Sequence, residues 1–562
     1  MKRWERPAAG REPAAAALLG WLADPVAPRL CLVSGSEGCG KSSLLAWLVH
    51  HGTRPGTPTE RTVHAVVPFA GRSLWGTVWS ISEQLGVVTR SPEELVATLK
   101  EDGRRTVMAL PDLHDDAVVG LVGDLLELPH IRLIVEARTG SAAHRRLSAS
   151  ACAELDLNQD QWRDQARFMQ WEASLASLPA ARSGAEPSAG DITLDLSDPA
   201  TVCAADPWLV TAGFEAAGHQ EHGGLRAAWL RAGPSLVRDQ SSGSRALSLL
   251  SVLGDGADPR LAPALEQLAD GEPWQVAWSR VRGDVKPPWP GPVKVMVNGQ
   301  GRFADSVLLA DHTGTVRAVN ATDATARGRM QLAEIRPDSV SVMADGTMLM
   351  ADGSGRVHLD STWTTRARPS GIAELLDGAP TAADRLKTAL QDASGTAIAW
   401  GPGPDIGLVA LGDGSGTVHT VGDITSSAAL HDAAVTDLAV LSLPLDGEVS
   451  LPIVYSGGAD GTVRAWAPGH DPMPGSVAER ACPVVSVDAA LSATGPVLAV
   501  AWTDGAVSWV HCNTGAQVLF RPGPPIRSVA LAAADRVVIG MDEAVTCLTL
   551  KAPDHLSGET AQ

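Results

Sequence analysis

The feature that most constrains the fold is a unit that recurs six times between residues 286 and 562. Each copy has an apolar segment, a turn containing Asp with Gly, Ser or Glu, and a second apolar segment. The copies read VLLADHTGTVRAV, MLMADGSGRVHLD, LVALGDGSGTVHTV, IVYSGGADGTVRAW, LAVAWTDGAVSWV and VVIGMDEAVTCLTL. Apolar segments joined by such turns are typical of β-hairpins. We therefore expect an all-β domain made of repeated hairpins.

The spacing of the copies predicts how the hairpins are arranged. A period of about 40 to 45 residues, with about four strands in each unit, is the signature of a β-propeller blade. The fourth copy ends at Trp466, and the preceding LHDAAVTDLAV resembles an element of the WD40 family at His431 and Asp437. This resemblance implies that the two residues are structural rather than catalytic and brace turns through hydrogen bonds. The Asp-Gly pairs are interpreted as turns rather than as metal sites.

The number of blades is left open at six or seven. Six copies are clear, but residues 363–394 contain AADRLKTALQDA, which is either a helical insertion or a degenerate blade. The last copy ends after its third strand. The segment WQVAWSRVR, residues 274–282, either supplies the missing outer strand and closes the ring or belongs to the preceding region.

The first half of the chain contains a phosphate-binding loop. LCLVSGSEGCGKSSLLAWLV, which begins at Leu30, combines an apolar strand, the pattern GxxxxGKS and a run of helix formers. In this context the loop wraps its N–H groups around phosphate, the lysine reaches the β and γ phosphates, and the following hydroxyl binds Mg²⁺. The residues predicted to bind ATP or ADP are Gly35, Gly38, Gly40, Lys41, Ser42 and Ser43, with Ser42 also a Mg²⁺ ligand.

An acidic element follows in RRTVMALPDLHDDA. Residues 106–110 are predicted to form a buried parallel strand that ends before Pro111, because proline removes a ladder donor. Asp112, at the exit of this strand, is predicted to hold the Mg²⁺ shell. Asp115 and Asp116 stand where an acid would activate the attacking water.

Five apolar segments alternate with helical segments in this half. The predicted strands are residues 29–33, 63–67, 106–110, 131–136 and 153–157, with a helix over about 73–85. This alternation predicts a multidomain protein whose first α/β domain has a parallel sheet with helices on both faces. Arg138 follows the fourth of these strands, where it would sense the γ-phosphate, although an ordinary surface arginine is the alternative.

Composition limits the partners and the compartment. The formal net charge of −19 argues against nucleic acid, which requires a basic surface. No apolar run is long enough to span a bilayer, so we expect no membrane partner. The seven cysteines are scattered without paired spacing, which fits a reducing cytoplasm and gives no zinc site.

Over about residues 7–285 the motifs resemble the STAND class of P-loop ATPases, relatives of AAA+ proteins that include NACHT and NB-ARC modules. Within AAGREPAAAALLGWL, Gly10 and Arg11 resemble the Gly-Arg pair that precedes the phosphate loop of that class. PDLHDDA resembles its DALDEA element, LIVEAR its sensor strand, and CAADPWLV its GLPLAL motif with Pro207 on the adenine side.

The resemblance implies functions for these residues. Arg11 and Pro207 would bind the nucleotide, and Asp115, Asp116 and Arg138 would be catalytic. Asp116 stands where the class usually has Glu, which implies slow or absent hydrolysis. The glycine of the GxP motif and an MHD motif are not evident.

Four regions are predicted: a lead-in helix over 1–28, the P-loop NTPase core over 29–177, a small helical lid or winged-helix-like region over 178–285, and a WD40-like propeller over 286–562. The resemblance implies an ATP-dependent sensor whose propeller recognises a protein or other ligand and whose NTPase module controls conformation or ligand-dependent homo-oligomerisation. Because about thirty residues precede the first strand, we expect an effector to act in trans.

The alternative function is a non-catalytic interaction scaffold that holds a structural nucleotide. A protein-remodelling motor ranks last, because no arginine finger or aromatic pore loop is evident. A GTPase is disfavoured by the lack of an NKxD motif.

Overall fold

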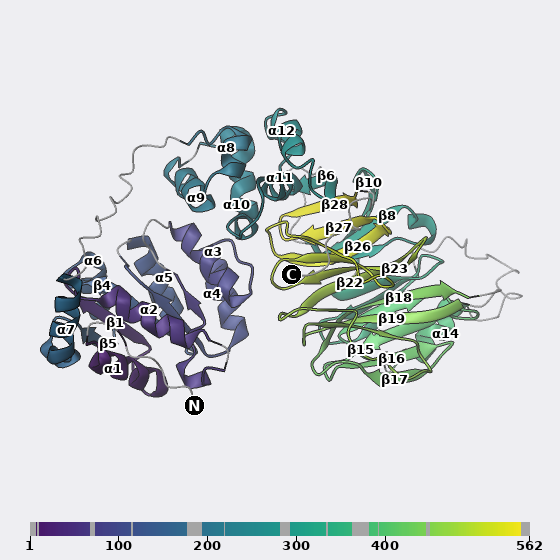
Figure 1. Cartoon of the computed structure of the whole chain (residues 1–562). Helices are drawn as coiled ribbons and strands as arrows, with labels where there is room; N and C mark the ends of the chain where they lie inside the picture. The colour runs from purple at the N-terminus through teal and green to yellow at the C-terminus, as the bar shows by residue number, and fades with distance from the viewer. Residues whose placement is uncertain are drawn as a thin grey trace, which may run out of the picture. The chain divides into compact units, whose positions relative to one another are not determined.

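The computed structural model describes residues 7, 10–54, 56–67, 73–113, 116–176, 194–218, 220–281, 293–332, 335–361, 381–391, 393–445 and 450–551. The chain divides into two compact units, each with its own sheets (Figure 1). The first unit comprises Met1–Leu196 and Ala205–His219, and the second comprises Ser197–Ala204 and Gln220–Gln562.

The first unit is built on a five-stranded parallel sheet with the strand order β2–β3–β4–β1–β5. The strands are β1 (Leu30–Gly35), β2 (Ala65–Val66), β3 (Thr106–Leu110), β4 (Ile131–Arg138) and β5 (Cys152–Asp156). Because the strands are parallel, the carboxyl ends of β1, β3 and β4 meet at one edge of the sheet. Strand β4 separates the phosphate-loop strand β1 from the acidic strand β3.

Helices cover both faces of this sheet, as predicted. The helices are α1 (Glu12–Ala23), α2 (Lys41–Gly52), α3 (Leu74–Leu85), α4 (Pro92–Asp102), α5 (Asp116–Leu126), α6 (Ala142–Ser148), α7 (Gln165–Ala176) and α9 (Pro207–Ala216). Successive strand residues point to opposite faces. Cys31 and Val33 pack in one core cluster with α1 and α2, whereas Leu30 and Leu32 are buried on the other face.

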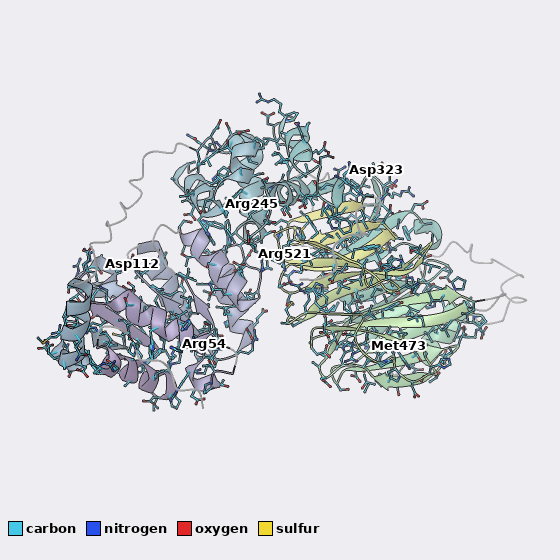
Figure 2. The ribbon with its side chains drawn as sticks, viewed as in Figure 1. Arg54, Asp112, Arg245, Asp323, Met473 and Arg521 are labelled. Carbon is cyan, nitrogen blue, oxygen red and sulfur yellow. The ribbon has the colours of Figure 1, made fainter. Side chains whose placement is uncertain are left out.

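The second unit begins with four helices: α8 (Pro199–Ala204), α10 (Leu225–Leu236), α11 (Ser242–Ser251) and α12 (Leu261–Leu268). Two of them are hydrogen-bonded to the sheets that follow. The hydroxyls of Ser235 on α10 and Ser248 on α11 both donate to the carbonyl of Arg521 at 2.9 Å (Arg521 is labelled in Figure 2). Thus α8 and α10–α12 group with the sheets of this unit, whereas α9 belongs to the first unit.

The strands of the described part of the second unit form six antiparallel sheets, and each sheet is one blade of a propeller. In blade order the strands are β7 (Val293–Asn298), β8 (Ser306–Asp311), β9 (Thr315–Asn320), β10 (Ala326–Gln331); β11 (Pro337–Val342), β12 (Met348–Asp352), β13 (Val357–Asp360); β14 (Ala397–Gly401), β15 (Leu408–Gly412), β16 (Thr417–Gly422), β17 (Ser426–Ala429); β18 (Val435–Pro444), β19 (Ser450–Gly458), β20 (Thr462–Trp466), β21 (Ala478–Glu479); β22 (Val484–Ser492), β23 (Gly495–Trp502), β24 (Val507–His511), β25 (Gln517–Phe520); and β26 (Ile526–Ala533), β27 (Arg536–Met541), β28 (Ala544–Leu550) with β6 (Trp274–Val281).

The innermost strands close a ring. Contacts run from β7 to β11, β14, β18, β22, β26 and back to β7, so the open choice between six and seven blades is settled at six. Hydrophobic clusters lie between successive blades rather than within one blade. The helix α14 (Ala382–Ala389) lies between the second and third blades, which makes this segment a helical insertion and not a degenerate blade.

Strand β6 completes the last blade by pairing antiparallel with β28, with Trp278 opposite Cys547. The indole N–H of Trp278 donates to the Ala321 carbonyl of the first blade at 3.0 Å. An unpaired β28 would leave a row of free backbone groups at the edge of the blade. Residues from before the first blade therefore close the ring, which is one of the two alternatives that the sequence left open.

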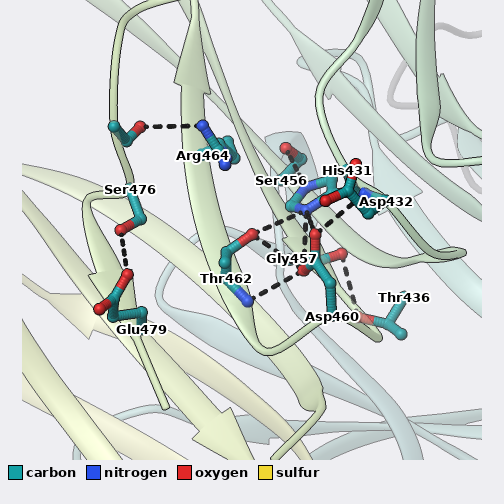
Figure 3. Close-up of polar contacts among 11 residues, drawn as sticks. His431, Asp432, Thr436, Ser456, Gly457, Asp460, Thr462, Arg464, Ser476 and Glu479 are labelled. Carbon is teal, nitrogen blue, oxygen red and sulfur yellow. Dashed lines mark hydrogen bonds and ion pairs between the residues drawn. The ribbon is translucent and has the colours of Figure 1, made fainter. Parts of the chain in front are cut away.

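The hairpin aspartates brace turns, as expected. The side chains of Asp311, Asp352 and Asp413 each accept the N–H of the residue two positions later at 2.8–2.9 Å. In the fourth blade His431 joins such a turn to the strands beside it (Figure 3). Its Nδ1 lies 3.1 Å from Asp460, and its Nε2 lies 2.8 Å from the Ser456 hydroxyl.

Candidate nucleotide-binding site

The phosphate loop joins β1 to α2 with the geometry that anion binding needs. Gly40 caps α2 with φ 91°, and Gly38 has φ 74°, both conformations that side chains disfavour. No side chain caps this end of α2, so the N–H groups of its first turn are not engaged by a cap. Free N–H groups and the helix dipole together favour phosphate at this point.

Lys41 turns back into the loop. Its ammonium group donates to the carbonyl oxygens of Gly35 at 3.1 Å and Ser36 at 2.8 Å, and the side chain is largely buried. A cation is thus held against the backbone that would surround a phosphate. Ser42 and Ser43 follow in the first turn of α2, where both are exposed.

Arg11 connects the loop to the segment after β5. Its guanidinium donates to the carbonyls of Leu157 at 3.0 Å, Trp162 at 3.4 Å and Cys39, the last of which belongs to the loop. The side chain is only 3% exposed, and this burial lowers the pKa of Arg11. Gly10 has φ 66°, and a Cβ there would collide with the Asp164 carbonyl, so the Gly-Arg pair fits this close approach. In this arrangement Arg11 positions the loop.

Glu136 is a member of the site that the sequence did not identify. Its carboxylate Oε1 accepts a 2.8 Å hydrogen bond from the Ser42 hydroxyl, and the residue is 3% exposed. Burial raises the pKa of Glu136, the Ser42 hydrogen bond and the charge of Lys41 oppose that rise, and the charge of Asp112 adds to it. Its sequence signals were its place near the end of an apolar strand and within LIVEAR, where only Arg138 was assigned a role. The order of the strands is what brings it beside β1.

Asp112 lies just beyond the end of β3 (labelled in Figure 2). Its φ of 56° lies in the left-handed region, which residues with a side chain adopt uncommonly and Asp adopts more often than most. Asp112 is exposed, and its charge acts on Glu136. Asp115 lies outside the described residues. Asp116 is the first residue of α5, so its backbone is near this edge of the sheet.

Arg138 lies beside the phosphate loop, whereas Pro207 lies on a helix that packs against α3. Arg138, the last residue of β4, is paired with Gly35 in the strand register and forms a 2.7 Å ion pair with Glu37 of the loop. Arg138 therefore lies next to the loop, and its side chain is 64% exposed. Pro207 is the first residue of α9, a helix that packs beside α3, where the N–H of Trp75 donates to Glu215 at 2.9 Å.

The residues around the loop fit a magnesium nucleotide. Ser42, Asp112 and Glu136 offer hard oxygen donors, which Mg²⁺ prefers. Glu136 Oε2 is buried and accepts no hydrogen bond of standard geometry within the described ranges, although the backbone N–H of Asp112 is near enough to lower the pKa of the carboxylate, so Oε2 can accept a cation or a bound water. Lys41 and the N-terminus of α2 supply positive potential for the phosphates. When bound, the ion would neutralise phosphate charge. Within the described ranges, no group of three or more His, Cys, Asp or Glu side chains has metal-binding spacing.

A second feature is the channel at the centre of the propeller. The innermost strands line a cavity of about 150 Å³, and its titratable side chains among the described lining residues are Asp437 and Asp488. Asp437 accepts the N–H of Val487 in the next blade at 2.9 Å, and Asp488 accepts that of Leu531 at 2.7 Å. Asp437 therefore braces the adjacent blade rather than a turn.

Burial raises the pKa of Asp437 to about 6 and that of Asp488 to about 7. The N–H groups that these carboxylates accept oppose the rise, while the charge of Asp437 adds to it at Asp488.

The fold defines a parallel α/β unit that is consistent with a P-loop NTPase, in one chain with a WD40-like six-bladed β-propeller. No protein-family model matches the chain, and no curated protein matches it. Among solved structures, the chain is similar to the crystal structure of the WD40 β-propeller domain of Doa1. The two are 12% identical, with 50% of this chain and 97% of that chain covered and a TM-score of 0.33. The closed ring of six sheets, not this likeness, establishes the propeller.

No helix in the described ranges has the length and apolar character that crossing a bilayer requires. All seven cysteines are free thiols.

Proposed function

We propose that this chain is an ATP-binding regulatory switch of the STAND type, in which the propeller recognises a protein ligand. The observation that carries the proposal is the phosphate loop. Lys41 lies inside it, Arg11 fixes it from beneath, and the exposed N-terminus of α2 faces the space where phosphate would bind. ATP or ADP with Mg²⁺ is the ligand that this combination of donors and cations suits best.

Two properties support ligand recognition by the propeller: its hydrogen-bonded connection to α10 and α11, and the acidic composition of the chain. Closure by β6 and the hydrogen bonds of Ser235 and Ser248 to Arg521 tie the helices α10 and α11 to the blades. A ligand that binds the propeller therefore acts on a body that includes these helices. The acidic composition favours a basic protein surface over nucleic acid as the ligand.

A switch requires that the ligand and the nucleotide each favour one conformation. Under this proposal, ATP with a propeller ligand stabilises an active state that assembles into homo-oligomers or recruits an effector supplied in trans, and ADP stabilises the inactive state. Arg138 would report the γ-phosphate through exchange of its exposed ion pair with Glu37. A surface pair of this kind contributes about 0–1 kcal/mol, so a phosphate displaces it easily.

The test compares the full chain with ADP and with ATP. Hydrogen exchange and the mass in solution are measured for the wild type and for Lys41→Ala, with Lys100→Ala on the exposed surface of α4 as the control. We expect the two nucleotides to give different exchange in α2 and α10 in the wild type and in the control, and no difference in Lys41→Ala. Tight nucleotide binding with identical exchange in both states would instead support the scaffold function.

A further inference from the structure

Glu136 is a buried carboxylate that lies at the phosphate loop but belongs to none of the motifs that define it. It comes from β4, the strand between the loop strand β1 and the acidic strand β3. In the register of the sheet it is opposite Val33, two residues before Gly35. Glu136 is thus one strand nearer to the loop than Asp112, the acid predicted from the sequence to hold the metal shell.

The hydrogen bond with Ser42 fixes the direction of the serine hydroxyl. The hydroxyl donates its one proton to Glu136 Oε1 at 2.8 Å. A serine oxygen has two lone pairs in addition to that proton. With the proton directed at Glu136, these lone pairs are free to ligate a cation. Glu136 therefore orients Ser42 in the way that a Mg²⁺ ligand requires.

The second oxygen of Glu136 is the observation that points to a ligand. Oε2 is buried, in a residue that is 3% exposed, and within the described part of the chain no hydrogen bond of standard geometry reaches it, although the backbone N–H of Asp112 is near enough to lower the pKa of the carboxylate. A buried carboxylate oxygen without a partner destabilises a fold unless something binds it. The charge of Lys41 lowers the pKa of this carboxylate and the charge of Asp112 raises it, so both groups are near enough to act on it.

We propose that Glu136 anchors the Mg²⁺ of a bound nucleoside triphosphate, with Oε2 directed at the ion or its water shell and Oε1 orienting Ser42. The inference rests on the proposed nucleotide function and assigns the metal anchor of that site to β4. Asp112 then completes the shell from the exposed side rather than serving as its principal acid.

The experiment measures how ATP affinity depends on Mg²⁺. Fluorescent ATP is titrated into the full chain in EDTA and at increasing Mg²⁺, for the wild type, Glu136→Gln and Glu154→Gln. Gln at position 136 retains an oxygen for Ser42 but places an NH₂ group, which cannot ligate a metal, at the Oε2 position. Glu154 on β5 is the control, because its Oε1 also accepts a serine hydroxyl, that of Ser34, at 2.8 Å, although it pairs with His144 as well and is exposed.

We expect Glu136→Gln to need at least about tenfold more Mg²⁺ for half-maximal ATP binding, with unchanged affinity in EDTA, and Glu154→Gln to match the wild type. If Glu136→Gln does not fold, Glu136→Asp keeps the charge with a shorter reach, and we expect an intermediate Mg²⁺ requirement. An unchanged Mg²⁺ requirement would overturn the assignment, even if turnover fell, because the carboxylate would then act on water or only on Ser42. A wild type that binds no ATP in any condition would refute the proposed function and this assignment together.

Discussion

Asp488→Asn tests whether burial in the channel of the propeller raises the pKa of the Asp488 carboxyl group. Asp488 lies on the innermost strand of the fifth blade, and its carboxylate accepts hydrogen bonds from the N–H groups of Ala489 and Leu531 and from Asn298. Despite these donors, burial raises its pKa to about 7. The substitution removes the titration but keeps most of the shape of the side chain.

The sign and size of the effect follow from linkage. A carboxyl group of Asp titrates near 3.9 in an unfolded chain. The folded protein therefore binds the Asp488 proton more tightly than the unfolded chain, and the free energy of unfolding falls as the pH rises through 7. Between pH 5 and pH 8 one group with these two pKa values lowers the free energy of unfolding by about 3 kcal/mol. Asp437, with a pKa of about 6, adds about 1 kcal/mol of the same sign.

Calorimetry of the full chain at pH 5 and pH 8 measures this effect on the transition of the propeller. We expect the Tm of the wild type to fall by more than that of Asp488→Asn, with a difference between the two of roughly 5 °C. Asp471→Asn, an exposed position between β20 and β21, is the control and should follow the wild type. An identical pH dependence in Asp488→Asn and the wild type would refute the argument that this carboxylate is neutralised on burial. The absolute stability of the variant is not the criterion, because Asn has one acceptor oxygen fewer.

Three further substitutions probe the hydrogen bonds and the backbone. His431→Ala leaves Asp460 and Ser456 without their buried partner, so calorimetry should show the propeller destabilised by about 2–3 kcal/mol, and an unchanged Tm would contradict the bracing role. Arg11→Lys retains the charge but cannot reach the carbonyls of both Leu157 and Cys39, so ATP affinity measured by calorimetric titration should weaken about tenfold. Equal affinity would show that the loop holds its shape without Arg11. Gly40→Ala places a side chain at φ 91°, which disfavours the loop conformation by about 1–2 kcal/mol. The same titration should therefore show ATP binding weakened by a comparable free energy, and unchanged ATP affinity would show that the loop does not need this conformation.

Local sequence signals predicted much of the fold. The strand 106–110 was predicted to end before Pro111, and it ends at Leu110, because a proline there cannot donate to the ladder. The six hairpins follow from Asp-containing turns, and in the first five the Asp side chain accepts an N–H of its own turn. Such interactions join residues only a few positions apart, so a local sequence pattern is enough to predict them.

Features that depend on distant neighbours were open or missed. The closure of the ring by Trp274–Val281 was one of two alternatives, because pairing with β28 joins segments more than 250 residues apart. Glu136 was passed over because its partner Ser42 is set by the strand order and not by sequence spacing. The propeller's inter-blade bonds, such as that of Asp488 to the Leu531 N–H, depend on the register between blades. The predicted roles of Lys41, Asp112, Arg138 and Pro207 in nucleotide binding stay predictions.

The most direct test of the proposed function is the nucleotide content and ATP turnover of the purified full chain, measured beside Lys41→Ala. Denatured samples are analysed for released adenine nucleotide, and phosphate release is followed with ATP and Mg²⁺. The account predicts about one bound nucleotide per chain and slow turnover in the wild type, with both lost in Lys41→Ala. A wild type that neither contains, binds nor hydrolyses ATP would contradict it, and the propeller alone would then have to explain what the protein does.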